Sequence, residues 1–311
     1  IACETAKLMK WTDPSVEIVA CGSSGRGMGT FGAWEAEVLD HTFDHVEYVS
    51  IHTYYGNHDG HTPSFLARPD EMDDFIREVV ATCDYVAAKR KSAKRIMLSF
   101  DEWNVWYHSH STSAKWAKDW TVAPPILEDA YTMEDALVVG GMLITLLNTA
   151  DRVKIACMAQ LVNVITPIRA ENKGMWLQTI YYSLQLFAAH CAGTSLDDYV
   201  ACDTYQAGEH KSVPYLDVSA AHDSSSRSVV INVVNRHRDQ FLETEIVNQS
   251  GRFASNATAY EVNASDPKVQ NSRTDQNVKI VQREFATGGG QRFLYRFPPH
   301  SFTLIKAKVQ E

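Results

Sequence analysis

Two adjacent carboxylates, Asp101 and Glu102, follow an apolar run and precede two tryptophans, Trp103 and Trp106. The run, residues 96–100, reads Ile-Met-Leu-Ser-Phe, which is typical of a buried strand in a parallel sheet. A carboxylate at the end of a buried strand costs stability, and the catalytic groups of α/β barrels lie at the C-terminal ends of their strands. The segment therefore indicates either a catalytic carboxylate or a structural ion pair.

The alternation of side chains along a strand decides which of the two carboxylates is expected in a site. Glu102 should share one face with Leu98 and Phe100, whereas Asp101 should share the opposite face with Ser99. We therefore take Glu102 as the candidate catalytic group. The expected role of Asp101 is a salt bridge to the shell of the domain.

The elements around this segment alternate between strand and helix patterns. Strand patterns cover residues 16–21, 46–52, 96–106 and 153–165, and helix patterns cover residues 31–41, 71–89, 127–147 and 176–190. The alternation predicts βαβ units in a parallel sheet. These strands are half of what an eight-stranded barrel needs, so an open doubly wound sheet is the alternative.

Several segments of the sequence resemble the α-L-arabinofuranosidases of glycoside hydrolase family 51, in the family's order and at close to its spacing. They are Ala20-Cys-Gly-Ser-Ser24, His52-Thr-Tyr-Tyr-Gly-Asn57, Ser99-Phe-Asp-Glu-Trp-Asn-Val-Trp-Tyr-His108, Trp120-Thr-Val-Ala-Pro-Pro125 and Ala159-Gln-Leu-Val-Asn-Val164. The resemblance covers the whole chain and is stronger before Tyr182 than after it. It implies that the α/β part is the C-terminal half of a (β/α)8 barrel whose first half lies upstream of Ile1.

The resemblance implies roles for two residues. The glutamate of the family's Asp-Glu-Trp-Asn segment is the nucleophile, which here is Glu102. The first tyrosine of the His-x-Tyr-Tyr-Gly-Asn segment hydrogen-bonds that nucleophile, which here is Tyr54. A tyrosine pair is more often a pair of core aromatics, but the adjoining His52 and Asn57 favour the functional interpretation.

His52 and Asn57 belong to the predicted substrate-binding set, together with Gln160 and Trp106. Gln160 lies in the otherwise apolar stretch 155–165, where a buried amide needs a hydrogen-bond partner. A sugar hydroxyl can be that partner, and the matching family residue contacts the arabinose ring. Trp106 would form an apolar wall of the site, or equally pack at its rim.

A second carboxylate is harder to find. Retaining glycosidases need two carboxyl groups about 5 Å apart, one as nucleophile and one as acid and base. In the resembling family the second group lies in an Asn-Glu pair, and no such dipeptide occurs in this sequence. We therefore expect the acid/base residue upstream of Ile1. Within the chain, Glu35, Glu37 and Glu171 are the alternatives.

The pattern changes at about Ser195 to short alternating or β-branched segments divided by Asn, Ser, Asp and Gly turns. These segments predict an antiparallel β-sandwich, and in the resembling family a jelly roll follows the barrel. We therefore expect a catalytic domain over residues 1–194 and a jelly-roll domain over residues 195–311. The second domain is interpreted as structural, with carbohydrate binding as the alternative.

Composition narrows the range of partners. The net charge is −9 and the isoelectric point is about 5.7, and no run of Lys and Arg exceeds residues 89–91. Nucleic acid and anionic membranes are therefore not expected as partners, whereas a neutral sugar polymer is compatible. The longest apolar stretch, residues 136–147, is too short to span a membrane.

The 6 cysteines are scattered without a CxxC pair. They indicate buried free thiols in a reducing compartment, and hence a cytoplasmic protein, rather than disulfides or a zinc site. No cofactor and no metal are predicted.

Together these observations predict the C-terminal portion of a retaining α-L-arabinofuranosidase. Its partner would be an arabinose-containing oligosaccharide or polysaccharide of the arabinoxylan or arabinan type, from which terminal residues are released. Another retaining barrel glycosidase, such as a β-xylosidase or endoglucanase, is one alternative. A fragment that is inactive without a separate N-terminal half is another. The resemblance also implies a homo-oligomer, often a hexamer.

Overall fold

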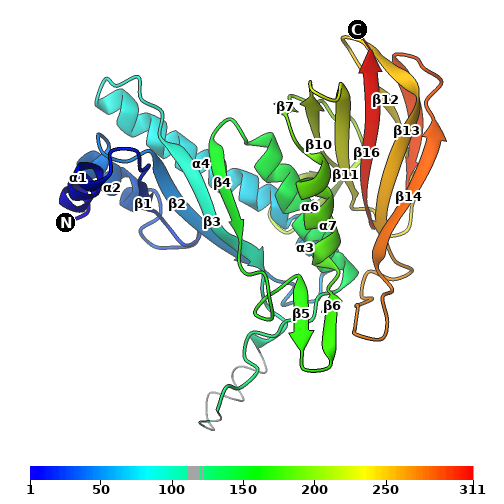
Figure 1. Cartoon of the computed structure of the whole chain (residues 1–311), viewed down its shortest axis with the longest axis horizontal. Helices are drawn as coiled ribbons and strands as arrows, with labels where there is room; N and C mark the ends of the chain where they lie inside the picture. Colours follow the sequence, from blue (N-terminus) through cyan, green and yellow to red (C-terminus); the bar gives the residue numbers. More distant parts are fainter. Residues whose placement is uncertain (111–119, 121, 311) are drawn as a thin grey trace. The chain divides into compact units, whose positions relative to one another are not determined.

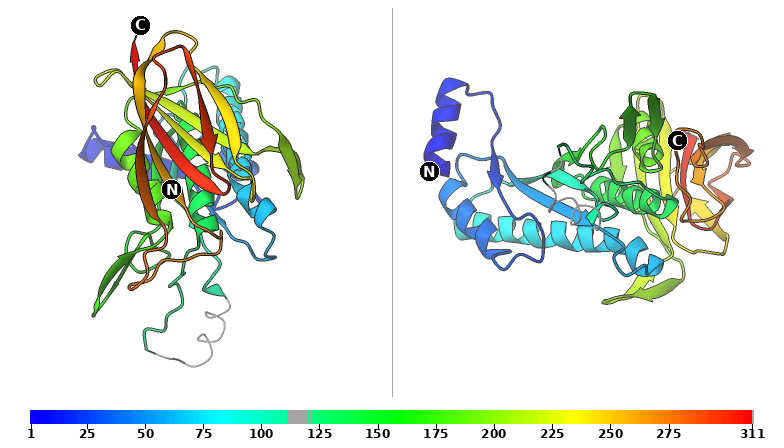
Figure 2. Two further views of the ribbon diagram at one scale, coloured as in Figure 1. Left: turned by 90° about the vertical axis from the view of Figure 1, so that its right-hand side faces the viewer. Right: turned by 90° about the horizontal axis from the view of Figure 1, so that it is seen from below.

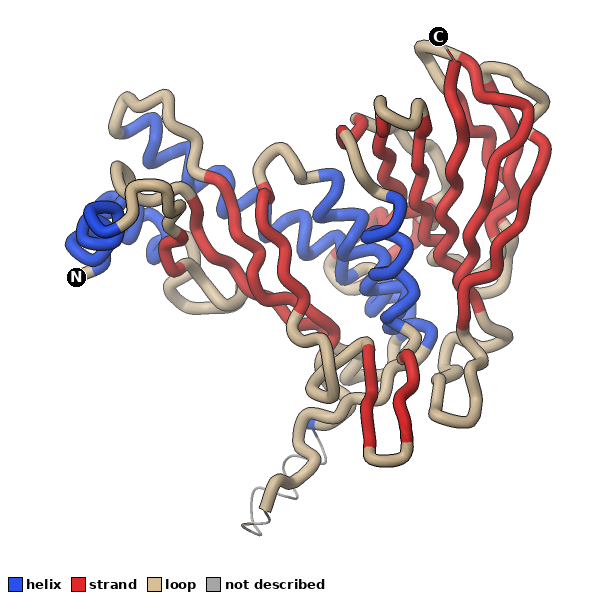
Figure 3. The backbone as a smooth tube through the Cα atoms, viewed as in Figure 1, coloured by secondary structure: helices blue, strands red, loops and turns tan. Residues whose placement is uncertain are grey.

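The computed structural model describes residues 1–110, 120 and 122–310. The chain forms two compact units. Unit 1 comprises residues 1–54, 70–104 and 149–159, and unit 2 comprises residues 55–69, 105–148 and 160 onward. Each unit is described by itself below. Figure 1 labels the elements, and Figure 3 shows the change from alternating helices and strands to a run of strands.

Unit 1 is built on a four-stranded sheet of order β1-β2-β3-β4. Its strands are β1 (Val19–Cys21), β2 (Tyr48–Tyr55), β3 (Met97–Val105) and β4 (Val153–Met158). The pairs β1–β2 and β3–β4 are parallel, as the alternation of elements predicted. The helices α1 (Ala2–Thr12), α2 (Ala33–Thr42) and α4 (Arg68–Lys89) belong mainly to this unit. Parallel strands need such crossover helices because a tight turn cannot connect them.

The core of unit 1 lies between α4 and the two central strands. Met72, Phe75, Ile76 and Val79 recur at helical spacing on α4, and all are buried. The ring of Phe75 meets that of Phe100 on β3 edge-to-face, with centroids 6.0 Å apart. This packing confirms β3 as a buried strand.

Strand β4 differs from the prediction. Residues 153–165 were expected to form one strand, but β4 ends at Met158 and exposes Lys154, Ala156 and Cys157. Its exposure follows from its place at the end of the sheet order, where β3 is its neighbour among the described residues. Residues beyond Met158 lie outside the strand.

Unit 2 contains the β-sandwich predicted for the C-terminal part. One layer is a six-stranded sheet of order β14-β13-β16-β11-β10-β7, and the other is the pair β12–β15. The strands are β7 (Thr194–Leu196), β10 (Leu216–Asp223), β11 (Ser228–Asn235), β12 (Leu242–Val247), β13 (Arg252–Asn263), β14 (Lys279–Ala286), β15 (Arg292–Phe297) and β16 (Ser301–Gln310). Phe293 and Phe297 of β15 pack against Leu216, Ile231 and Ile305 of the larger sheet and form the core between the layers.

Helices α6 (Met133–Asn148) and α7 (Ile180–His190) cover the other face of the six-stranded sheet (Figures 1 and 2). Phe187 of α7 stacks on Phe302 of β16 at 5.8 Å. A Cβ at Gly140 of α6 would lie only 3.3 Å from the Phe302 ring, so glycine permits this close packing. The larger sheet is therefore buried on both faces, which explains the nearly continuous burial of β11.

Three smaller elements complete unit 2. They are the short helix α3 (Thr62–Leu66), the hairpin of β5 (Ile168–Glu171) with β6 (Gly174–Leu177), and the hairpin of β8 (Thr204–Ala207) with β9 (His210–Pro214). The two hairpins were not predicted. The domain boundary between residues 194 and 195 stays a prediction, since α6 and α7 share a compact unit with the sandwich.

All 6 cysteines are free thiols. Cys83 is buried, and burial raises the pKa of its thiol to about 12. Cys21 and Cys157 are exposed, so the expectation that every cysteine is buried is wrong. Cys21 lies in β1 and Cys157 in β4, and these strands are at the two ends of the sheet order. No helix within the described part of the chain combines the length and the hydropathy needed to cross a membrane.

Candidate active site

Glu102 and Tyr54 meet near the ends of two neighbouring strands, β3 and β2. The Tyr54 hydroxyl donates a hydrogen bond to Oε1 of Glu102, which is the contact expected from the sequence. Burial raises the pKa of Tyr54, and the hydrogen bond to Glu102 and its negative charge raise that pKa further. The phenol therefore keeps its proton at neutral pH and acts as a donor to the carboxylate.

His52 lies between both carboxylates of the Asp-Glu pair. Its Nε2 is 2.9 Å from Oδ1 of Asp101, and its Nδ1 is 3.6 Å from Oε2 of Glu102. The Ser50 hydroxyl donates to the same Oδ1 of Asp101 at 2.8 Å. Ser50, His52 and Tyr54 lie on one face of β2 because they alternate along the strand. We call Ser50, His52, Tyr54, Asp101 and Glu102 the carboxylate cluster.

The position of Asp101 corrects the expectation that it points away from Glu102. Phe100 of β3 pairs with Ala156 of β4, but Trp103 pairs with Met158. Three steps along β3 thus match two along β4, which marks a bulge at the two carboxylates. A bulge breaks the strict alternation and re-aims side chains. Both carboxylates are partly exposed here, whereas the residues before and after them are buried.

A glycine lets the chain after β1 approach Ser50 closely. A Cβ at Gly22 would lie 2.2 Å from the Ser50 carbonyl oxygen, so any larger residue would displace the backbone there. The next residue, Ser23, donates its backbone N–H to Oε1 of Glu35 at 2.7 Å, and Gly32 donates to Oε2 at 2.8 Å. Glu35 is fully buried, so it holds the loop between β1 and α2.

None of the alternative acids is joined to Glu102 by a hydrogen bond or ion pair among the described residues. Both oxygens of Glu35 accept backbone N–H groups. Glu37 is exposed on α2 and lies 3.1 Å from His41. Glu171 ends β5 in unit 2 and lies 3.8 Å from Arg169. These surroundings give no support to the three residues as partners of Glu102.

Unit 2 contains a second polar cluster, in the segment that follows β3. Buried Asp129 accepts the backbone N–H groups of Tyr107, His108 and Ser109 at 2.9–3.0 Å. The Nε2 of His108 lies 2.8 Å from Oδ2 of Asp135. Burial by itself lowers the pKa of His108, but the hydrogen bond and negative charge of Asp135 outweigh it, so this pKa is raised.

This segment carries Trp106, the predicted apolar wall. Trp106 is half-buried, and its indole Nε1 donates to the Ser109 hydroxyl at 3.4 Å. Its ring meets the ring of His110 edge-to-face at 4.9 Å. The backbone contacts to Asp129 fix the direction in which Trp106 leaves β3. Of the Trp120–Pro125 segment, Thr121 lies outside the described residues.

Asn57 lies in a buried environment rather than an open one. It is only 8% exposed, and its Nδ2 donates to Oε1 of Glu134 at 3.1 Å. Thr62 and Lys268 also donate to Glu134, which is fully buried at the start of α6. The Oδ1 of Asn57 has no hydrogen-bond partner among the described residues. These surroundings do not support the prediction that Asn57 contacts a substrate.

Gln160 also differs from its predicted setting. It lies after the end of β4 and is exposed, so the expectation that it belongs to the strand is wrong. Its path is set by two contacts of β3 with Ala159, one from the Asn104 side chain and one to the Trp103 carbonyl. The structure therefore brings together Glu102, Tyr54 and His52 within unit 1, and places Asn57, Trp106 and Gln160 in unit 2.

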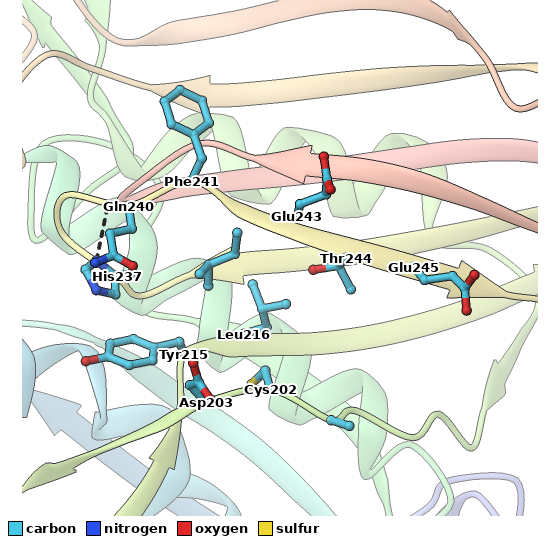
Figure 4. A pocket seen from close by; sticks show the side chains of 12 residues that line it. Cys202, Asp203, Tyr215, Leu216, His237, Gln240, Phe241, Glu243, Thr244 and Glu245 are labelled. Carbon is cyan, nitrogen blue, oxygen red and sulfur yellow. Dashed lines mark hydrogen bonds between the residues drawn. The ribbon is translucent and has the colours of Figure 1, made fainter.

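A cavity of about 540 Å³ lies in the sandwich, away from all of the predicted site residues in sequence (Figure 4). Asp203, Glu243 and Glu245 line it together with Tyr215 and His237. The ring of Tyr215 already stacks on Tyr205 at 4.8 Å and on His237 at 4.6 Å. Phe241 also lines the cavity, and the Arg296 guanidinium lies over its ring at 4.2 Å. These contacts occupy part of the aromatic surface that a sugar ring would need, so the cavity does not favour the carbohydrate-binding alternative.

Among residues 1–110, 120 and 122–310, no group of three or more His, Cys, Asp or Glu side chains is arranged to hold a metal ion. The carboxylate cluster itself has one histidine and two carboxylates, but Glu102 is tied to Tyr54 and Asp101 to Ser50. Its chemistry is that of a hydrogen-bonded carboxylate, which can act as a nucleophile or as a proton acceptor.

Comparison with known proteins decides the family. Residues 101–301 match the model of the α-L-arabinofuranosidase C-terminal domain. The chain is 45% identical over 311 residues to intracellular exo-α-(1→5)-L-arabinofuranosidase 1 of Bacillus subtilis, covering 100% of this chain and 62% of that protein. The chain belongs to the family-51 α-L-arabinofuranosidases.

Two further family members agree with this assignment. An intracellular exo-α-(1→5)-L-arabinofuranosidase of Halalkalibacterium halodurans is 51% identical over 246 residues, which are 79% of this chain and 49% of that protein. The solved family-51 α-L-arabinofuranosidase from Bifidobacterium longum superimposes with a TM-score of 0.85 at 29% identity, over 98% of this chain and 62% of that one. The chain thus spans about half to two thirds of the length of these relatives.

Several residues of the two clusters in this family-51 chain were missed by the sequence analysis. Asp101 was set aside because strict alternation was assumed, and Ser50 was not considered. Asp135 had a detectable signal, since Thr132-x-x-Asp135 before an apolar run is a helix-capping pattern. Thr132 lies just before α6, and its backbone N–H donates to Oδ2 of Asp135 at 2.7 Å. No local pattern marks Asp129, because its partners lie about 20 residues earlier in the chain.

Tyr54→Phe tests the hydrogen bond to Glu102 in the intact protein. It removes one donor and leaves the ring in place. A hydrogen bond to a charged group contributes about 1.5–3 kcal/mol, so we expect turnover of an aryl arabinofuranoside to fall by about 10–100-fold. The melting temperature should stay near the wild-type value. Unchanged turnover with a lowered melting temperature would show that Tyr54 has only a structural role.

Proposed function

We propose that this chain carries the nucleophile of a retaining exo-α-L-arabinofuranosidase, and that Glu102 is that nucleophile. One observation supports this most directly. The Glu102 carboxylate lies at the end of β3, partly exposed, with a Tyr54 hydroxyl donor on one oxygen and His52 beside the other. Membership in the arabinofuranosidase family makes glycoside cleavage the chemistry for such a carboxylate.

The proposed reaction has two displacement steps. In the first, Glu102 attacks the anomeric carbon, the glycosidic carbon–oxygen bond breaks, and the leaving oxygen receives a proton from the acid/base residue. In the second, the acid/base residue removes a proton from water, and the water attacks the glycosyl ester and releases Glu102. Tyr54 and His52 act in both steps, because they orient the carboxylate for attack and stabilise its charge as it departs.

We further propose that the acid/base residue comes from polypeptide outside these 311 residues. The sequence has no Asn-Glu pair, and Glu35, Glu37 and Glu171 have other partners. The sheet β1–β4 would then be half of a (β/α)8 barrel, completed at its two end strands, with a jelly roll from residue 195 onward. The end positions of β1 and β4 in the sheet formed by the described residues support this proposal, because a strand edge without a partner favours pairing.

The proposed substrate is a terminal arabinofuranosyl residue of an arabinan- or arabinoxylan-type oligosaccharide. The names of the relatives support an exo mode, and the acidic net charge suits a neutral sugar better than a polyanion. Trp106 and Gln160 are proposed to contact the sugar. A cytoplasmic location and a homo-oligomer complete the proposal.

Glu102→Ala in the intact protein should abolish turnover, because no glycosyl ester can form. Adding azide should restore part of the activity on a substrate with a good leaving group, since a small anion can enter the space left by the carboxylate and attack the sugar. The activity is measured as aryl arabinofuranoside cleavage with and without azide.

Glu37→Ala is the matched control, because Glu37 is an exposed glutamate of unit 1 whose ion-pair partner is His41. It should retain wild-type turnover. Near-wild-type turnover of Glu102→Ala would refute Glu102 as the nucleophile. Aryl xyloside and cellooligosaccharide assays of the wild type distinguish the alternative β-xylosidase and endoglucanase activities.

The 311-residue chain expressed alone should have no activity on an unactivated arabino-oligosaccharide. Without an acid/base residue it lacks proton transfer, which is typically worth about 10²–10⁴-fold in rate. The free edges of β1 and β4 should also promote association with other chains. Co-expression with the N-terminal region of a family-51 relative should restore turnover.

A dinitrophenyl substrate separates the lack of an acid/base residue from a failure of the chain to stay folded and soluble, because its leaving group needs no proton. A folded chain with Glu102 but no acid should release dinitrophenol slowly and then stall as the glycosyl ester. A soluble, fully active isolated chain would contradict the proposal and would return Glu35, Glu37 and Glu171 to consideration.

A further inference from the structure

We propose that Asp101 and Ser50 are positioning residues that orient His52 toward the nucleophile. The inference rests on the proposed function, because it takes Glu102 as the nucleophile. Together with Tyr54, the three residues would place one polar partner at each oxygen of the Glu102 carboxylate. Among the described residues, neither the Asp101 nor the Ser50 side chain makes a hydrogen bond or ion pair with Glu102, and in this proposal neither touches the substrate.

The hydrogen bonds fix the proton arrangement of His52. An ionised carboxylate only accepts hydrogen bonds, so the His52 Nε2 that faces Asp101 at 2.9 Å must carry a proton. The bond made by one ring nitrogen sets the state and direction of the other. The other nitrogen, Nδ1, is thereby directed at Glu102, whose Oε2 lies 3.6 Å away. That distance is longer than a hydrogen bond.

The direction of the ring is what Asp101 and Ser50 would supply. With Nε2 held by Asp101 on one side, Nδ1 on the opposite side of the ring faces Oε2 of Glu102. The ring is thereby placed beside the carboxylate oxygen that Tyr54 does not bind, where it would act as the glycosyl ester breaks and the carboxylate departs.

The recorded contacts of Asp101 lie within the carboxylate cluster. Its contacts are the Ser50 hydroxyl and the His52 ring, and among the described residues no Lys or Arg pairs with it. Its side chain is about one third exposed, at 33%, as is that of His52. A carboxylate with this exposure contributes little to stability through a neutral hydroxyl alone. The bulge in β3 turns this side chain toward His52.

Ser50 holds the Asp101 carboxylate in position. Its hydroxyl donates to Oδ1, the same oxygen that accepts from His52, and its Oγ lies 3.3 Å from His52 Nε2. Ser50 and His52 are two residues apart on β2, so the strand itself sets their spacing. The close approach of Gly22 to the Ser50 carbonyl holds this part of β2 against the chain after β1.

Three variants of the intact protein test the inference. Asp101→Asn removes the charge and keeps the shape, and we expect kcat to fall by about 10–100-fold, the worth of a charge-assisted hydrogen bond. Ser50→Ala removes the hydroxyl, and kcat should fall by about 3–10-fold. Ser50→Thr keeps a hydroxyl on the strand and should stay within about twofold of the wild type. KM and the melting temperature should change little in all three.

Asp44→Asn is the control for loss of a carboxylate, since Asp44 pairs with Arg90 outside the carboxylate cluster. It should leave kcat unchanged. If Asp101→Asn and Ser50→Ala keep wild-type kcat while Glu102→Ala is inactive, the inference is wrong and the proposed function stands. A fall in kcat of Ser50→Thr equal to that of Ser50→Ala, or a matching loss of melting temperature, would also overturn it. An active Glu102→Ala would overturn the proposed function instead.

Discussion

The pairing of β2 with β3 is the constraint on which the candidate active site depends. The two strands are neighbours in the sheet, so Tyr54 near the end of one can donate its hydroxyl to Glu102 near the end of the other. The core between α4 and the strands, including the Phe75–Phe100 contact, holds β3 in place beneath its carboxylates. Burial and the Glu102 charge raise the pKa of Tyr54, so the donor keeps its proton wherever Glu102 is ionised.

Much of the fold follows from local patterns in the sequence. The spacing of Met72, Phe75, Ile76 and Val79 predicted α4, and the apolar run before Asp101 predicted β3, because burial imposes these periods on a chain. Local patterns failed where tertiary context decides the outcome. The apolar pattern predicted a strand through residue 165, but β4 ends at Met158, so Gln160 lies beyond the strand.

In the candidate site, too, some residues follow from local patterns and others from tertiary context. Glu102 and Tyr54 could be named from motifs, and their hydrogen bond is present in the structure. The direction of Asp101 could not be predicted, because β3 has one extra residue relative to β4 at this point and the extra residue breaks the alternation of side chains. No residue type in the sequence indicates such a bulge. The contact of Asn57 with a substrate stays a prediction. In the structure its side chain donates to buried Glu134, as those of Thr62 and Lys268 do, and no local pattern indicated this contact.

Covalent trapping tests the role of Glu102 most directly. A 2-deoxy-2-fluoro-arabinofuranoside with a dinitrophenyl leaving group can form the glycosyl ester without an acid residue, and the fluorine slows its hydrolysis. After reaction of the intact protein and proteolysis, mass spectrometry of the peptides locates the adduct. The account predicts one added glycosyl group on the peptide that contains Glu102, with fragmentation placing it on Glu102 rather than Asp101. An adduct on any other carboxylate, with an unmodified Glu102 peptide, would contradict it.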